Sequence, residues 1–259
     1  MNSFFLYVVI PAFTLFLIFT NRFYYTKRES NKMRFNMRED LFFGNIVGPI
    51  VGLIIMLAIY ANILNITYIS QLRWELLVIF TVAVLALIIG IGTGGHIAAI
   101  TIEATLKNAK RSEEVDNALY YFHWPFGHKL TFVPTILIFY IMILFDLFKG
   151  APELLVFHQS LILVCCALVL SAFASVVFVV THVTRIMFYT FGTLSLSILI
   201  VLMSEQITLD YHLIAYFFTI MFINTFILIG FYRYSHLISP KLSTYIQSRF
   251  PGGDKVYEG

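Results

Sequence analysis

The chain has 259 residues, of which 59% are apolar and only 12% are charged, and its mean hydropathy is +0.86. A soluble domain carries about a quarter of its residues as charged side chains, so this composition excludes a soluble globular enzyme and indicates a chain that is partly solvated by lipid. The net charge of +3 is not accompanied by a lysine-rich tail, and we expect no nucleic-acid partner.

The apolar residues gather into runs of about 18 or more, the length that an α-helix needs to cross roughly 30 Å of hydrocarbon. The sequence therefore predicts an all-α, polytopic integral membrane protein with a single transmembrane domain. We predict about seven transmembrane helices, at residues 3–20, 41–61, 74–102, 130–148, 154–181, 186–203 and 209–232. No basic segment precedes the first run, so we interpret it as a retained span rather than a signal peptide.

The second predicted span carries glycines at every fourth position, Gly44, Gly48 and Gly52. Three glycines on one helix face let another backbone approach closely, so this face suits packing against a neighbouring helix, a second copy of the chain or another subunit. A transport helix hinged at Pro49 is the alternative.

The third predicted span contains a glycine-rich run, residues 90–95, directly before His96. The missing side chains leave a groove that suits either a neighbouring helix or a flat cofactor or lipid tail. Charged residues between 103 and 129 recur at helical spacing, and we expect this segment to continue the third helix into the cytoplasm until the chain returns at His123–His128.

Residues 154–203 form one nearly continuous apolar stretch, too long for a single crossing of a membrane. The polar residues Thr181–Arg185 near its centre are the predicted turn. With that turn, 15 of the 17 lysines and arginines fall on one side, and only Arg73 and Lys149 fall on the other. The positive-inside rule then places the N-terminus outside and the C-terminus in the cytoplasm.

Polar residues are sparse in the remaining spans. We expect residues such as Asp146, Ser171 and Asn224 to serve mainly as hydrogen-bond partners between helices.

The predicted cytoplasmic side collects imidazoles from three different spans. They are His96, His123, His128 and His182. Glu103 follows His96 on the same helix face, and Arg185 lies one turn beyond the last of these histidines. Ionisable groups at membrane depth are costly and mark functional sites by default, and imidazole with carboxylate is a ligand set for Zn and Fe.

We therefore hypothesise a metal-dependent membrane enzyme that acts on a lipid or another apolar substrate at the cytoplasmic leaflet. His96, His123, His128 and His182 are its predicted metal ligands. Glu103 would be a ligand or general acid/base, and Arg185 would hold an anionic head group.

Three alternatives stay open. In an electron-transfer subunit, His96 and His182 would be the axial ligands of haem b. In a transporter or a scaffold subunit, the glycines of the second span would carry the function. The histidines would otherwise be interfacial residues, common at helix ends for amphipathic reasons.

Overall fold

The computed structural model of the chain describes residues 5–15, 33–34, 37–38, 42, 47, 50–51, 72–106, 111–149, 154–239, 241 and 244–245. Of the predicted first span, residues 5–15 are described, and they are helical throughout. The predicted second span lies almost entirely outside the described residues, and so do Gly44, Gly48 and Gly52.

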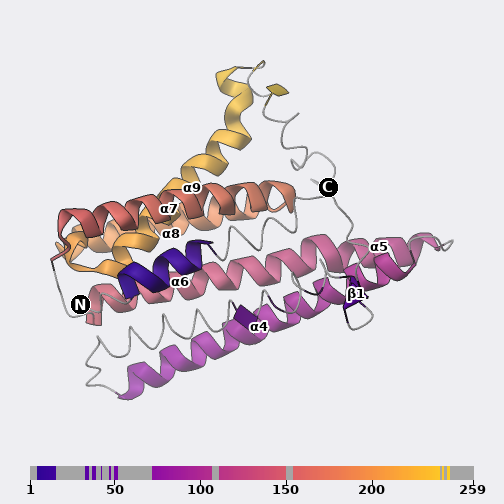
Figure 1. Ribbon diagram of the computed structural model, residues 1–259, viewed down its shortest axis with the longest axis horizontal. Coiled ribbons are helices and arrows are strands. Elements are labelled where there is room, and N and C mark those ends of the chain that lie inside the picture. The colour runs from indigo at the N-terminus through magenta and orange to yellow at the C-terminus, as the bar shows by residue number, and fades with distance from the viewer. Residues whose placement is uncertain are drawn as a thin grey trace. The chain divides into compact units, whose positions relative to one another are not determined.

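The described part of the chain is built mainly from helices (Figure 1). A short π-helix, η1 (Phe5–Val9), opens it, and a two-residue antiparallel pair follows, β1 (Met33–Arg34) with β2 (Met37–Arg38). The later elements are α4 (Leu72–Thr105), α5 (Glu113–Tyr121), η3 (Phe122–His128), α6 (Lys129–Lys149), α7 (Phe157–Val180), α8 (Thr184–Ser204), η4 (Leu209–Tyr211) and α9 (Leu213–Ile238).

Five helical segments in the described residues are long and apolar enough to cross a membrane. They are Leu77–Glu103, Glu113–Phe148, Phe157–Val180, Thr184–Ser204 and Leu213–Ser235. Each overlaps one of the last five predicted spans, although the segment Glu113–Phe148 begins well before the predicted 130–148. This confirms the helical, membrane-type character of those runs. The count of seven spans and the orientation remain predictions.

The turn between α7 and α8 lies within the polar segment Thr181–Arg185, as predicted. α7 ends at Val180, His182 has a left-handed backbone with a φ of 56°, and α8 begins at Thr184. The N–H of Val183 donates to the carbonyl of Phe178 at 3.1 Å, and the N–H of His182 donates to Val179 at 3.3 Å. This pair of bonds is the Schellman arrangement that ends many helices, so His182 closes α7.

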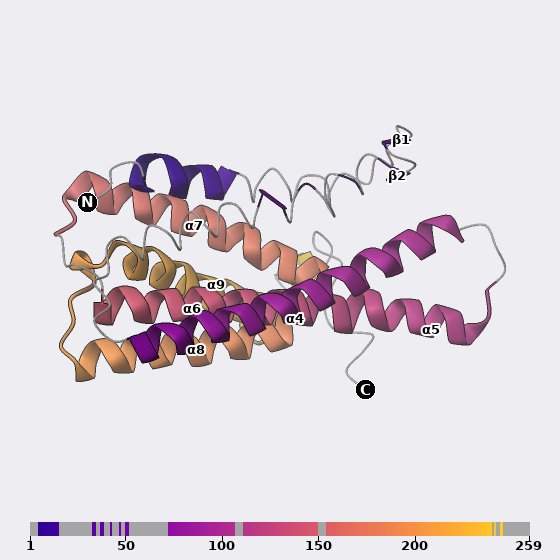
Figure 2. The same cartoon turned by 90° about the horizontal axis from the view of Figure 1, so that it is seen from below.

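The expectation that residues 103–129 continue the third helix is wrong. α4 ends at Thr105, and α5, η3 and α6 then follow one another without a break from Glu113. α5 runs back beside the C-terminal part of α4 (Figures 1 and 2). The charged spacing correctly indicated a helix, but spacing carries no information on which neighbouring helix that segment extends.

The chain divides into two compact units, each made of three segments. The first comprises Met1–Ile69, Met142–Val177 and Leu194–Thr225. Inside it, buried Asp146 near the end of α6 accepts hydrogen bonds from the backbone N–H groups of Ile214 and Ala215 at 2.9 and 2.8 Å. These N–H groups belong to the first turn of α9, where helical N–H groups have no partner within the helix, so the carboxylate caps α9.

Asn224 donates to the hydroxyl of Ser171 in the same unit, as expected for polar residues that join helices. Asp146 also satisfies that expectation, although its partner is backbone rather than side chain.

The second unit comprises Ser70–Ile141, Phe178–Thr193 and Phe226–Gly259. In it, α8 and α9 interlock through two reciprocal phenylalanine–glycine contacts. Phe188 of α8 packs over Gly230 of α9, and Phe226 of α9 packs over Gly192 of α8. The two rings stack on each other with centroids 4.8 Å apart, so small residues and aromatic rings hold this pair of helices together.

Candidate metal centre

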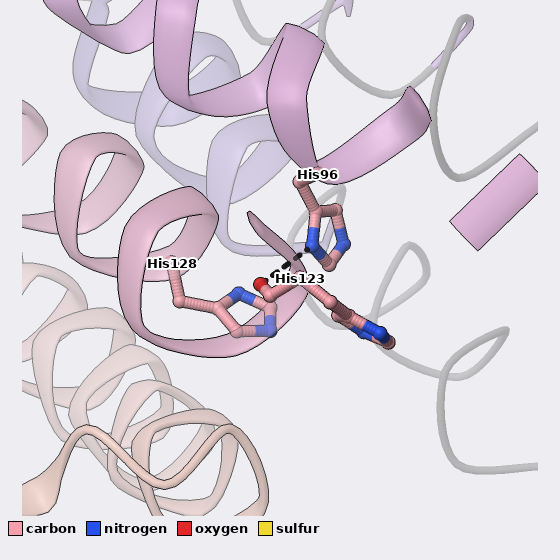
Figure 3. A group of neighbouring side chains, drawn as sticks. All are labelled: His96, His123 and His128. Carbon is pink, nitrogen blue, oxygen red and sulfur yellow. Dashed lines mark hydrogen bonds between the residues drawn. The ribbon is translucent and has the colours of Figure 1, made fainter. Parts of the chain in front are cut away.

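Three of the predicted histidines lie together in the second unit. His96 comes from α4, while His123 and His128 come from η3 (Figure 3). We call these three residues the histidine cluster. His96 and His128 are buried, with 8% and 7% of their surface exposed, and His123 is half-buried.

The π-helical form of η3 explains how His123 and His128 reach the same place. In an α-helix, residues five apart are rotated by about 140° and face different directions. In a π-helix the hydrogen bonds run from i to i+5, so residues five apart lie on nearly the same face. Pro125, inside η3, has no backbone N–H and interrupts the ordinary helical ladder at this point.

Gly127 lets α4 approach η3 so closely that His96 of α4 reaches His123 and His128. A Cβ atom at Gly127 would lie 2.8 Å from Cβ of His96 and 2.7 Å from the carbonyl oxygen of Phe122. Both distances are shorter than a van der Waals contact, so only glycine fits between the two backbones without a shift.

The cluster is compact enough to hold a metal ion. Each of its three residues offers one ring nitrogen, and these nitrogens lie within 4.8 Å of one another. The ring centroids of His96 and His128 are 4.4 Å apart, and those of His96 and His123 are 4.9 Å apart. In the described part of the chain, this is the group of histidine, cysteine and acidic side chains with metal-binding geometry.

Hydrogen bonds determine which ring nitrogen of His96 and of His123 carries a proton. Nδ1 of His96 lies 3.2 Å from the carbonyl oxygen of His123, drawn as the dashed line in Figure 3. Nδ1 of His123 lies 3.1 Å from a carboxylate oxygen of Glu103. Carbonyl and carboxylate oxygens accept hydrogen bonds, so both Nδ1 atoms carry a proton and donate, and Nε2 of each ring keeps a lone pair when that ring is neutral.

The third imidazole carries an unsatisfied atom. Nε2 of His128 is fully buried and has no hydrogen-bond partner among the described residues. A buried polar atom without a partner costs roughly 1–3 kcal/mol, so such an atom in a native fold needs an explanation.

Trp124 packs against the cluster and links it to the predicted fourth histidine. Its ring stacks on His123 with a centroid distance of 4.5 Å and an interplanar angle of 10°, and it meets His182 edge to face at 5.1 Å. His182 is not part of the group of three with metal-binding geometry. Arg185 is exposed in the first turn of α8. The roles predicted for these two residues, as a metal or haem ligand and as a head-group contact, remain predictions.

The glycine-rich run before His96 is divided between two environments. A Cβ atom at Gly92 would lie 2.7 Å from Cβ of Leu130 on α6, and one at Gly95 would touch the ring of Phe126. Gly90 and Gly94 have no described atom within 4 Å of an added Cβ. One side of the run therefore admits a neighbouring helix, which is one of its two predicted uses.

The contributions of Trp124 and Gly127 were not among the features predicted from the sequence. The signal was present, because both lie between His123 and His128 in a segment that also holds Pro125. A proline and a glycine within one helical turn indicate an irregular helix, and irregular helices often carry functional residues.

No family model, curated protein or solved structure compared with this chain gives a significant match. The class of this protein is therefore described from its fold and its site alone. In its described residues the chain is a helical protein with five helical segments of membrane-spanning length and a largely buried three-histidine cluster, one member of which contacts a carboxylate.

Proposed function

We propose that this protein is a multi-pass membrane enzyme that binds one Zn or Fe ion through His96, His123 and His128. The observation that carries the proposal is the convergence of these three side chains, one of which has a buried Nε2 with no described partner. A metal ion would accept the lone pair of that nitrogen and remove the cost of its burial.

The distances support a site that closes by a small movement. Metal–nitrogen bonds of about 2.0–2.1 Å place the ligands of a tetrahedral site roughly 3.4 Å apart, so nitrogens now within 4.8 Å of one another must approach by at most about 1.4 Å.

Three neutral imidazoles are the ligand set of catalytic rather than closed structural zinc sites. A metal held by three ligands keeps a free coordination position and acts there as a Lewis acid. The helices around the site are long and apolar, which favours a lipid or another apolar substrate. With the orientation predicted from the basic residues, the site opens at the cytoplasmic leaflet, and Arg185 would hold an anionic head group there.

Elemental analysis of the purified protein in detergent tests the proposal. We expect about one Zn or Fe per chain in the wild type and none in His96→Ala, His123→Ala or His128→Ala. His158→Ala is the matched control, since His158 is bonded to Tyr7 at 2.8 Å in the other unit and should leave the metal content unchanged. A wild type that holds no metal and binds none from added Zn²⁺ or Fe²⁺ would refute the proposal.

The same purified proteins distinguish a site for a single metal ion from a haem site. A Soret band would support haem b bound by His96 and His182, whereas the close packing of His96 on His128 favours a single ion. His182→Gly tests His182 as a fourth ligand, because glycine accepts the left-handed backbone at this position without strain. We expect this variant to keep its metal.

A further inference from the structure

Two contacts restrain the ring of His123 in different directions. The stacked ring of Trp124 restrains the plane of the imidazole, and the carboxylate of Glu103 restrains its rotation within that plane. The carboxylate approaches Nδ1 with both oxygens, at 3.1 and 3.3 Å, so the bond survives small rotations of either side chain.

Glu103 and His96 lie seven residues apart on α4, which is two helical turns, and so they share a face of the helix. One helix thus presents a histidine of the cluster and also the carboxylate that holds a histidine of the neighbouring element η3. The side chain of Glu103 is 34% exposed, whereas that of His123 is 15% exposed, so the carboxylate lies on the outer side of the pair.

We propose that Glu103 is the positioning residue of His123: it keeps Nδ1 protonated and directs Nε2 to the metal, and it is neither a metal ligand nor a general acid or base. This inference rests on the proposed metal function. A carboxylate bound to the second nitrogen of a ligating histidine fixes its tautomer and orientation, and its loss costs about 10- to 100-fold in metal affinity.

Affinity for Co²⁺, measured by its visible absorption in the purified full-length protein, tests the assignment. We expect Glu103→Ala to weaken binding about 10- to 100-fold and Glu103→Gln to weaken it less, because the amide oxygen still accepts a hydrogen bond. Glu113→Ala, an exposed carboxylate on α5, is the control for the loss of a charge and should bind like the wild type.

The shape of the Co²⁺ spectrum distinguishes a positioning residue from a ligand. We expect the saturated spectra of the wild type and Glu103→Ala to coincide, because the ligands are the same, and the metal-free variant to unfold at the temperature of the wild type. Equal affinity in Glu103→Ala, or a changed spectrum, would overturn the assignment of Glu103 alone. A wild type without Co²⁺ binding would overturn the proposed function as well.

Discussion

The contact between α4 and α6 at Gly92 gives a sharp test of the packing in the second unit. An added Cβ would lie 2.7 Å from Cβ of Leu130, 2.8 Å from its carbonyl carbon and 3.0 Å from N of Thr131. Carbon atoms prefer separations of about 3.5–4.0 Å, so Gly92→Ala must move the two helices apart by roughly 1 Å. Overpacking of this kind costs about 1–3 kcal/mol.

Gly94→Ala is the matched control on the same helix, because an added Cβ there meets no described atom within 4 Å. Both substitutions gain about 0.8–1.0 kcal/mol of helix propensity, so the difference between the two variants isolates the packing cost. A cost of about 1–3 kcal/mol corresponds to roughly 2–12 °C in Tm for a chain of this size.

Thermal unfolding in detergent, followed by circular dichroism, measures this difference. Equal Tm values for Gly92→Ala and Gly94→Ala would refute the packing argument. A double variant sharpens the result: Leu130→Ala keeps the Cβ and backbone atoms that clash, so it should not restore the stability of Gly92→Ala. Recovery in the double variant would mean that the outer part of the leucine side chain, and not the backbone approach, limits the space.

Three further substitutions test other contacts. Asp146→Ala leaves two buried N–H groups at the start of α9 without an acceptor and should lower the free energy of unfolding by about 2–5 kcal/mol. The control is Asp210→Asn at an exposed carboxylate, which should change the thermal midpoint little. Gly127→Ala places a Cβ 2.8 Å from Cβ of His96 and should reduce Co²⁺ affinity at least as much as a lost carboxylate, as a binding titration would show. Co²⁺ should quench the fluorescence of Trp124, which stacks on His123, so Trp124→Phe should abolish the quenching while Trp74→Phe keeps it.

The helices were predictable because hydrocarbon thickness imposes a minimum length on any apolar run that crosses it. The same reasoning required a fold-back within residues 154–203, and the polar residues near His182 were the available turn. The cap on α9 was not predictable, because Asp146 lies 68 residues before the N–H of Ile214 and no local pattern links the two. Contacts of that separation depend on how the helices pack, which a single sequence does not specify.

The site was predictable as a set of residue types but not as a geometry. The one-sided placement of the histidines in the predicted topology selected His96, His123 and His128 together with His182, which is not in the group of three. Ordinary helical spacing would have turned His123 away from His128. Their convergence depends on a π-helical segment and on a glycine at the crossing with α4. Glu103 was also among the predicted site residues. Its contact is with His123, because α5 and η3 run back beside α4 and bring His123 to the carboxylate.

These departures from regular structure occur together, and that supports a function for the cluster rather than a packing role. A π-helical segment, a close backbone approach and a buried nitrogen without a described partner all carry a free-energy cost, and natural sequences accept such costs mainly at functional sites. A bound ion would offset them and would therefore stabilise the folded chain. At a Zn²⁺ concentration 100 times Kd, the gain is about 2.7 kcal/mol, or roughly 5–11 °C in Tm. The wild type should show this rise and His128→Ala should not. If Zn²⁺ raised the Tm of both proteins equally, the ion would bind elsewhere, and the strain at the cluster would have another cause.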